Sequence, residues 1–409
     1  MAVRASLHEV GGVLLEKLLA ADDGYRGWQI DCGQAHRASF VDYRSKTLQT
    51  VLSKLKLRRA YYHCADCQQG CAPRDGELDI VRTSFSPGVR RLMGRLGSKE
   101  PFDEGRADLE ALAGIVVHTK EVERVSERLG EQVETIARQE RQAALSGKIV
   151  LIKSVPKLYL AIDGTGVPLV PRETQGRQAK DDSGKAKTRE VKLGCVFTQT
   201  SWDEKGRPVR DPASTSYVGA IETAEEFGQR IFTEAIRRGL RRAQRVIVIG
   251  DGAPWIWSIA AEHFPGATEI VDLYHAREHL SNLAKILWEA SRGKAWAEAR
   301  MQQLEAGDIE GLLSAMGRLR PRSPIVKDEL RKAVTYFQTN AERMRYQSFR
   351  TQGLFVGSGV VEAGCKTIVG RRLKQSGMRW TVRGANAIIA LRCCYLSGRW
   401  EEFWEARCG

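Results

Sequence analysis

The chain has no run of about 18 consecutive apolar residues, the length that an α-helix needs to cross a bilayer. Its N-terminus also lacks the charged stretch followed by an apolar stretch that marks a secretory signal. These two absences argue against a membrane partner and against secretion, so we expect a cytoplasmic protein. Internal repeats and low-complexity tracts are absent as well, so each segment has to be interpreted individually.

An even set of cysteines that could form a disulfide framework is also missing. The chain has nine cysteines, an odd count in a long chain without a secretory signal, and this argues against structural disulfides. Three of them, Cys64, Cys67 and Cys71, lie close together in the sequence. Such crowding is more typical of a metal site than of scattered thiols.

The chain is long, moderately apolar and basic. Its 409 residues suit about two to four domains, and an apolar content of 42% is enough to bury a sizeable core. Lysine and arginine total 64 against 50 acidic residues, which gives a formal net charge of +14. An excess of positive charge favours a polyanionic partner, and nucleic acid is the commonest one.

Hydrophobic periodicity predicts an α/β core followed by a block of helices. Short apolar runs predict strands at 158–162, 167–170, 191–200, 245–250 and 268–271. Helical spacing predicts helices at 222–240 and 254–264, a helical block from 275 to about 350, and a final helix that begins near Val360.

Two aspartates directly follow predicted strands. Asp163 and Asp251 each stand at the end of an apolar run, where a side chain reaches the rim of a sheet while its backbone stays rigid. Carboxylates that lie close together repel each other unless cations separate them, and Mg²⁺ prefers a few carboxylates together with water and phosphate oxygens. The alternative is that both residues only shape turns, because each is followed by glycine.

A third acidic residue, Glu362, stands in the first turn of the predicted final helix. It could serve only the helix dipole, or it could be the third metal ligand. Between Glu362 and Glu401 there are eight lysines and arginines and no acid. One acid beside such a basic stretch is what a DNA-cutting site requires, and the candidates for DNA contact there are Arg371, Arg372, Lys374 and Arg379.

Four motifs, in their order along the chain, resemble the DDE transposases of the ISKra insertion-sequence group. Three of them are Ile162-Asp163-Gly164-Thr165-Gly166-Val167-Pro168, Asp251-Gly252-Ala253-Pro254-Trp255-Ile256-Trp257 and Asp272-Leu273-Tyr274-His275-Ala276-Arg277-Glu278-His279-Leu280. The fourth is Gly357-Ser358-Gly359-Val360-Val361-Glu362, followed by Cys365-Lys366 and Gly370-Arg371-Arg372-Leu373-Lys374. The resemblance covers roughly residues 30 to 405.

The resemblance implies an RNase H-like fold with a mixed sheet in βββαβαβα order, carrying a metal-binding triad of Asp163, Asp251 and Glu362. It implies Mg²⁺ or Mn²⁺ as cofactor, and double-stranded DNA (transposon terminal inverted repeats and target DNA) as partner. A homodimer or higher oligomer on DNA is implied too, in a bacterial, nucleoid-associated setting. Asp272 and His275 resemble an Asp-x-x-His signature and are expected to support the metal ligands or to contact DNA; alternatively, His275 only begins a helix.

With the resemblance, the sequence divides into five segments. They are a zinc-ribbon-like region (1–85), a helix-turn-helix-like region (86–150), the first part of the catalytic core (151–275), a helical insertion (276–352) and a C-terminal segment that completes the core (353–409). Two other functions stay open. One is a catalytically silent, domesticated DNA-binding protein, and the other is an RNase H-like structure-specific nuclease that cuts DNA without joining it.

The cysteines of the first segment have the spacing of a zinc site in part. Cys64-x-x-Cys67 can bring two thiolates to one tetrahedral zinc ion. Cys32 is the best third ligand, and His36 or Cys71 would be the fourth. The family pattern would place a second Cys-x-x-Cys near Cys32, and this chain lacks it, so buried thiols without zinc are the alternative.

The second segment contains two helical patterns separated by Gly114. Thr119 is the expected N-cap of the second helix and Gly130 its expected end. If the pair is a helix-turn-helix, Lys120 and Arg124 would lie in a DNA major groove. A helical hairpin that only packs is the alternative.

Overall fold

The computed structural model describes residues 2–148, 154–178, 184, 186–357 and 359–407. The chain forms two compact units. Unit 1 comprises Met1–Leu129 and Trp400–Gly409, and unit 2 comprises Gly130–Arg399. No helix in the described ranges combines the length and apolarity that a membrane span requires.

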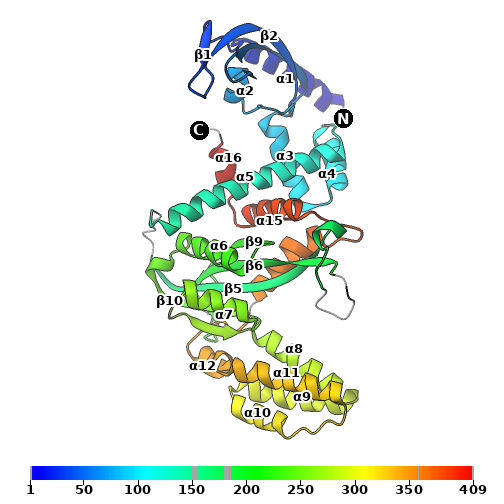
Figure 1. Cartoon of the computed structure of the whole chain (residues 1–409), viewed down its shortest axis with the longest axis vertical. Helices are drawn as coiled ribbons and strands as arrows, with labels where there is room; N and C mark the ends of the chain where they lie inside the picture. Colours follow the sequence, from blue (N-terminus) through cyan, green and yellow to red (C-terminus); the bar gives the residue numbers. More distant parts are fainter. Residues whose placement is uncertain (1, 149–153, 179–183, 185, 358, 408–409) are drawn as a thin grey trace. The chain divides into compact units, whose positions relative to one another are not determined.

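Unit 1 begins with a long helix and an antiparallel sheet (Figure 1). Their bounds are α1 Ala2–Ala20, β1 Gln29–Asp31, β2 Arg37–Gln49, β3 Lys54–Cys64, β4 Gln69–Cys71 and α2 Pro73–Glu77. The strands pair in the order β1-β2-β3-β4, and β2 and β3 form a long two-stranded ribbon. On one side of this ribbon, Leu55 and Leu57 are buried with Ile80, and Leu15 and Leu19 of α1 pack against them.

The rest of unit 1 is helical. Its elements are α3 Pro87–Lys99, α4 Phe102–Asp108, the π-helix η1 Leu109–Ala113, α5 Thr119–Leu145 (whose residues from Gly130 onward belong to unit 2) and α16 Trp400–Glu405. Gly114 has φ +70° and ends the helical segment before it, as predicted. Phe102 of α4 packs against an apolar core that holds α3, η1 and α5 together: Val89, Met93, Leu109, Ile115, Val117 and Val122.

The prediction that Gly130 ends a helix is wrong, because α5 continues through it to Leu145. The glycine has a packing role instead. A Cβ atom at Gly130 would lie 2.1 Å from the carbonyl oxygen of Ala387 in α15 (Val382–Leu396). Only a residue without a side chain permits this close crossing of two helices.

Unit 2 is built on a mixed five-stranded sheet. The strands are β5 Val155–Pro168, β6 Thr188–Gln199, β9 Ser216–Ala220, β10 Ala243–Gly250 and β11 Thr268–Val271, and their order in the sheet is β11-β10-β5-β6-β9. β10 pairs in parallel with β5 and with β11, whereas β6 is antiparallel to both β5 and β9. The predicted α/β core with a mixed sheet is confirmed.

Helices cover both faces of this sheet. Neighbouring residues of a strand point to opposite faces, and at β6 the Cβ position of Gly194 faces α6 (Ala224–Arg237), whereas Leu193 contacts α13 (Gly359–Gly364) at Gly364. Helix α7 (Pro254–His263) packs beside α6, and α15 packs on β9. A minor pair of strands, β7 Ser201–Trp202 and β8 Pro208–Val209, and the short helices η2 Pro171–Glu173 and η3 Leu240–Arg242 lie in the connections.

Two predicted strands differ from the structure. Residues 167–170 do not form a strand of their own, because β5 extends through Asp163 to Pro168 as the first arm of a hairpin with β6. In chain order the second strand of the sheet is therefore β6 and the third is β9. The periodicity did not indicate β9. The predictions of strands at β10 and β11 and of a helix at α6 are confirmed.

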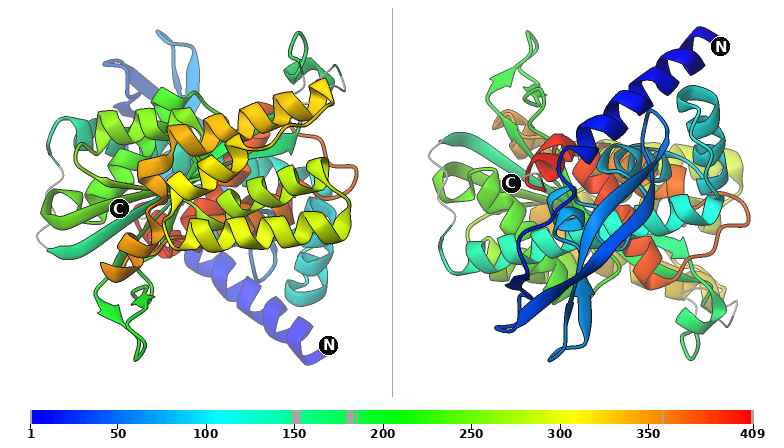
Figure 2. Two further views of the ribbon diagram at one scale, coloured as in Figure 1. Left: turned by 90° about the horizontal axis from the view of Figure 1, so that it is seen from below. Right: turned by 90° about the horizontal axis from the view of Figure 1, so that it is seen from above.

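The second half of unit 2 contains the predicted helical block (Figure 1, Figure 2). Its elements are α8 Leu273–Leu287, α9 Ala290–Glu305, α10 Ile309–Gly317, α11 Pro324–Thr339, η4 Ala341–Met344 and α12 Tyr346–Thr351. α8 begins at the residue after Asp272, so the block leaves the sheet directly at the end of β11. After the block the chain returns to the sheet through α13, the π-helix η5 (Cys365–Gly370) and α14 (Arg371–Leu373).

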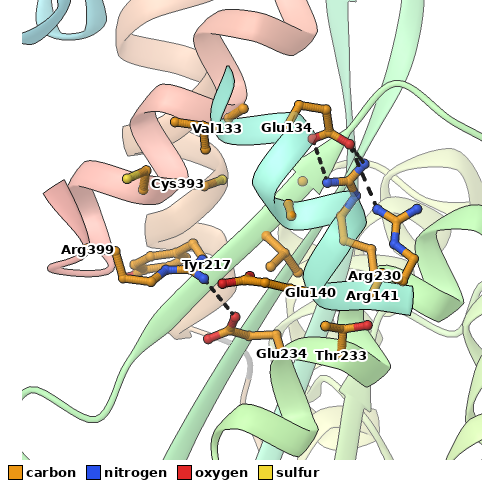
Figure 3. Close-up of a pocket in the computed structure, with 15 residues that line it drawn as sticks. Val133, Glu134, Glu140, Arg141, Tyr217, Arg230, Thr233, Glu234, Cys393 and Arg399 are labelled. Carbon is orange, nitrogen blue, oxygen red and sulfur yellow. Dashed lines mark hydrogen bonds and ion pairs between the residues drawn. The ribbon is translucent and has the colours of Figure 1, made fainter. Parts of the chain in front are cut away.

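A buried group of charged side chains ties α5 to α6 (Figure 3). The Arg230 side chain is only 10% exposed and lies 2.8 Å from Glu134 and 2.6 Å from Glu222. The adjoining cavity has a volume of about 50 Å³, which leaves little room for a ligand. We therefore assign this group to packing.

Replacing Arg230 with methionine is expected to lower the free energy of unfolding by about 3 kcal/mol, because two carboxylates would lose their buried partner. Urea titration measures the change. Arg331→Met is the matched control, since Arg331 forms an exposed pair with Asp328 and its loss should alter stability little. Equal stability of the two variants would contradict a packing role for Arg230.

Candidate functional site

The carboxyl ends of three neighbouring parallel strands carry acidic residues. Asp251 directly follows β10, and Asp272 directly follows β11. Asp163 lies in β5 two residues beyond Ala161, which is the last residue paired with β10. The prediction that Asp163 ends its strand is therefore wrong, but the carboxylate still lies at the edge where the parallel pairing stops.

The Asp163 side chain is largely buried and makes two hydrogen bonds. Its Oδ1 accepts the N–H of Gly164 at 2.7 Å, and its Oδ2 accepts the thiol of Cys365 at 3.3 Å. Burial raises the pKa of Asp163, and the charge of Asp251 adds to this effect. A desolvated carboxylate beside a second one is a site that attracts a cation.

Asp251 is held by the turn that follows β10 and by the helical block. Its Oδ1 accepts the N–H of Ala253 at 2.8 Å, and its carbonyl oxygen accepts the hydroxyl of Tyr336, in α11, at 2.9 Å. Gly252 has φ +101°, and a Cβ atom there would lie 2.6 Å from the ring of Tyr336. The glycine thus permits the tyrosine to close over the turn, while the ring of Tyr336 stacks on His279 at 4.0 Å.

Asp272 is fully buried and fixes the start of α8. Its Oδ1 accepts the backbone N–H of His275 at 2.8 Å and lies 3.3 Å from Nδ1 of the same residue. The hydrogen bond to Asp272 raises the pKa of His275 to about 9, and Asp163 and Asp251 contribute. His275 lies in the first turn of α8, as the alternative predicts, and its side chain also lines a cleft together with Asp163 and Glu362.

Glu362 reaches the same place from the other end of the chain. Ligand atoms of Glu362, Asp272 and His275 lie within 4.8 Å of one another. A cleft of about 410 Å³ is lined by Asp163, Thr165, Tyr274, His275, Glu278, Glu362, Cys365, Lys366, Gly370 and Lys374. The structure therefore brings Asp163 and Glu362 to one cleft. Asp251 is not among the residues that line this cleft, but its charge acts on both Asp163 and His275.

Lysines stand at the rim of this cleft. Lys374 donates to the hydroxyl of Thr165 at 2.5 Å, and Lys366 lies 3.7 Å from Glu362. Arg371 and Arg379 are exposed on the same segment. These side chains are available to neutralise a phosphate backbone.

Arg372 has a different role from the predicted DNA contact. It is fully buried, and its guanidinium lies over the ring of Trp380 at 5.1 Å. Trp380 is itself buried and donates to the carbonyl oxygen of Leu373. We therefore assign Arg372 to packing, because a side chain without solvent access cannot reach DNA.

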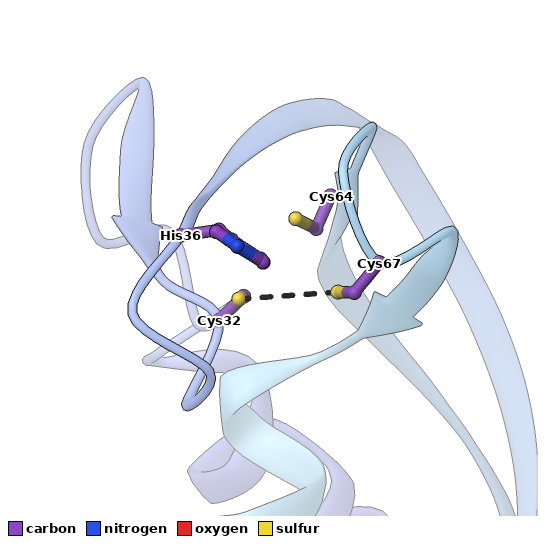
Figure 4. A group of neighbouring side chains, drawn as sticks. All are labelled: Cys32, His36, Cys64 and Cys67. Carbon is purple, nitrogen blue, oxygen red and sulfur yellow. Dashed lines mark hydrogen bonds between the residues drawn. The ribbon is translucent and has the colours of Figure 1, made fainter.

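A second group of ligand atoms lies in unit 1, where Cys32, His36, Cys64 and Cys67 converge (Figure 4). The sulfur atoms of Cys32 and Cys67 are 3.9 Å apart. Two thiolates on one tetrahedral zinc at about 2.3 Å would be about 3.8 Å apart, so the spacing fits a shared ion. Cys71 is exposed and lies outside this group, which makes His36 the fourth candidate ligand.

The two residues of the helical region in unit 1 that were predicted to contact DNA are both exposed. Lys120 forms an ion pair with Glu123 at 2.6 Å, and Arg124 lies one turn further along α5. The hydroxyl of Thr119 donates to Asp103. Both side chains are therefore accessible to a partner.

The sequence interpretation missed two residues of the site. Cys365 lies three residues after Glu362, a spacing that puts both on one helical face, and this signal could have indicated it. Tyr336 gave no such signal, because only the packing of α11 against the end of β10 brings it to Asp251.

Comparisons with known proteins identify a family. The chain matches an uncharacterised protein family, UPF0236, over residues 2–406. The UPF0236 protein in the vanSb 3′ region of Streptococcus gallolyticus is 22% identical over 397 residues, which cover 96% of this chain and 79% of that protein. A solved structure, the Drosophila P element transposase strand transfer complex, is similar with a TM-score of 0.26 and 10% identity over 82% of this chain and 84% of that one. Because the family match covers nearly the whole sequence, the chain belongs to the family UPF0236.

Proposed function

We propose that the protein is a DNA transposase that cleaves transposon ends and joins them to target DNA. One observation carries the proposal: acidic residues from the edge where the parallel pairing of β5, β10 and β11 stops, and one from α13, lie at or beside a cleft whose rim is basic. Such an arrangement suits divalent cations and a polyanionic substrate together.

The topology of the sheet supports an RNase H-like core for this enzyme. In the order β11-β10-β5-β6-β9, β6 runs against the other four strands, and two helices follow the third and fourth strands of the core in sequence. The motif resemblance to the ISKra insertion-sequence group points to the same core, with the helical block as its insertion. We assign the metal ligands as Asp163, Asp251 and Glu362.

The remaining residues of the cleft have supporting roles in this proposal. Asp272 orients the ring of His275 toward the acidic residues, and Lys374 and Lys366 hold the phosphate backbone at the rim. Mg²⁺ or Mn²⁺, when bound, would polarise the scissile phosphate and lower the pKa of an attacking water. The residues of the chain position both reactants and neutralise charge.

Two displacements at phosphorus complete the proposed reaction. In the first, a water oxygen bonds to phosphorus, the bond from phosphorus to the 3′-oxygen breaks, and that oxygen takes a proton to leave a 3′-hydroxyl and a 5′-phosphate. In the second, the 3′-hydroxyl oxygen bonds to a phosphorus of target DNA and releases its proton, while the displaced target 3′-oxygen takes up a proton and leaves as a 3′-hydroxyl. The number of phosphodiester bonds is unchanged in the second step, so no external energy is needed.

The test uses DNA that flanks the gene as substrate, with Mg²⁺ or Mn²⁺. We expect cleavage at inverted repeats and, with pre-cleaved ends, joining to a target plasmid. Cleavage without joining would favour the structure-specific nuclease. Specific binding without cleavage in either metal would favour a domesticated DNA-binding protein.

For unit 1 we propose a zinc ion held by Cys32, His36, Cys64 and Cys67. The backbone N–H of Cys67 lowers the pKa of Cys64, while the neighbouring thiol raises the pKa of Cys67 to about 11. A divalent cation stabilises the thiolate forms of such crowded cysteines, and its binding releases their protons. The ion would join the β1–β2 connection to the turn between β3 and β4.

Tyr336 is expected to position Asp251 for this chemistry. Tyr336→Phe removes the hydroxyl that donates to the Asp251 carbonyl oxygen, and we expect cleavage at limiting Mg²⁺ to fall about tenfold, as is typical of residues that orient metal ligands. Raising the Mg²⁺ concentration should restore most of the rate, which a merely structural defect would not show. Tyr159→Phe is the control, since it also removes a buried hydroxyl, the one bonded to Gln199. Identical Mg²⁺ dependence in the two variants would contradict the assignment.

A further inference from the structure

One side of the β2–β3 ribbon is open and carries a row of cations. Lys54, Lys56 and Arg58 alternate along β3 and are exposed, whereas the intervening Leu55 and Leu57 are buried on the opposite side. Their cross-strand partners on β2 are small or amide-bearing residues: Gln49, Thr47 and Ser45. The row therefore presents positive charge with no carboxylate among these six positions.

The ribbon as a whole also carries a net positive charge. From residue 37 to residue 64 the sequence contains seven lysines and arginines and one acid, Asp42. Outside the ribbon, the carboxylate of Asp23 lies 3.5 Å from the guanidinium of Arg58 and partly compensates its charge. This ion pair involves neither Lys54 nor Lys56.

Exposed aromatic rings continue the row. The guanidinium of Arg58 lies 3.6 Å from the centre of the Tyr43 ring, and Tyr43 contacts Phe40 edge-on. Trp28 packs edge-on against Phe40 and Tyr25 and is 75% exposed. A tryptophan with this much accessible surface is uncommon in a folded domain.

The backbone that carries Trp28 is nevertheless fixed. Phe40 donates its N–H to the Trp28 carbonyl oxygen at 2.9 Å. The hydroxyl of Tyr62, which is fully buried, accepts the N–H of Arg26 and donates to the carbonyl oxygen of Gly27. An exposed ring on a rigid support loses little conformational entropy when it binds a partner.

We propose that this surface, the ribbon face (Trp28, Tyr43, Lys54, Lys56 and Arg58), binds DNA. The three cations contact phosphates, and Trp28 stacks on an unpaired base. The inference rests on the proposed function, because that function makes DNA the substrate that these cations and this ring would contact. A two-stranded ribbon also matches the width of a DNA major groove, and aromatic stacking accepts any base.

Fluorescence anisotropy of the full chain with labelled DNA tests the cations. Lys54→Thr, Lys56→Thr and Arg58→Thr are combined, since threonine is favourable in strands. We expect weaker binding and a slope of log affinity against log salt that is shallower by about 2.5 to 3, because each lost phosphate contact removes about 0.9. A variant with arginine at both lysine positions should bind as the original chain does.

A second triple variant controls for net charge. Arg318, Arg320 and Arg322 are exposed on the helical block, and their replacement by threonine removes the same charge from unit 2. An equal loss of slope in both triple variants would overturn the assignment of the ribbon face.

Trp28→Ala tests the stacking contact. We expect about tenfold weaker binding to duplex DNA with a single-stranded 3′ extension, an unchanged salt slope, and little effect on blunt duplex. Equal losses on both substrates would refute stacking on an unpaired base. Tighter binding to the matching RNA than to DNA would assign the ribbon face to RNA instead.

Failure of the inference differs from failure of the proposed function. If the unaltered chain binds and cleaves DNA while the ribbon variants bind it with the original salt slope, only the ribbon face is wrong. If Asp251→Ala cleaves at the original rate, the proposed chemistry is wrong whatever the ribbon variants do.

Discussion

Asp251→Ala is expected to reduce DNA cleavage in Mg²⁺ by about a thousandfold or more, since a metal ligand supplies several kcal/mol of transition-state stabilisation. Asp163→Ala and Glu362→Ala should have the same effect. DNA affinity should change little in each variant, because the basic rim of the cleft is unaltered. A gel assay for nicked product and an anisotropy titration measure the two quantities separately.

The control for these variants is Asp328→Ala on α11. Asp328 is an exposed carboxylate paired with Arg331 and Lys332, so its loss changes the charge equally and should leave cleavage intact. A thermal shift provides an independent measure, as Mn²⁺ should raise the melting temperature of the unaltered chain and not of the three variants. Full cleavage by Asp251→Ala would refute the triad.

The second large effect is expected at the cysteine cluster. Protein washed with a weak chelator should keep one zinc ion per chain, and Cys64→Ser should lose both the zinc and the cooperative unfolding of unit 1. Structural zinc binding has a free energy of about 10–16 kcal/mol in zinc-finger peptides, so this loss should exceed that of any single packing contact. Metal analysis by mass spectrometry and thermal unfolding measure it.

Cys71→Ser is the matched control for this prediction. Cys71 is a nearby exposed cysteine outside the group of four, and its replacement should leave the zinc content unchanged. His36→Ala tests the fourth ligand. Zinc-free protein with normal unfolding, or equal zinc loss in Cys71→Ser and Cys64→Ser, would show that the cysteines do not form the proposed site.

Local signals explain what could be predicted from the sequence. The apolar run before Asp251 and the helical spacing of apolar residues at 222–240 are local patterns of burial, so β10 and α6 were identified correctly. Asp163 was assigned to the right edge of the sheet for the same reason, although its strand continues. The hairpin that extends β5 depends on pairing with β6, and an apolar pattern alone does not contain that information.

Features that depend on tertiary packing could not be predicted. Gly130 has the signature of a helix end, and only the approach of Ala387 shows why α5 needs a glycine there. Arg372 stands in a basic stretch that suggests DNA contact, and only the fold places it over Trp380. In both cases the residue type has a common local role, but its role in this protein is a packing contact that only the folded structure shows.

The helical block has a consequence for attempts to shorten the protein. Tyr336 donates to the carbonyl oxygen of Asp251, and Tyr346 donates to that of Val271, just before Asp272. A miniaturised variant with a short linker in place of the block would leave both carbonyl groups without these donors and would free the turns beside two acidic residues. Any compact derivative must therefore supply substitutes for these two hydroxyl groups, whatever else it discards.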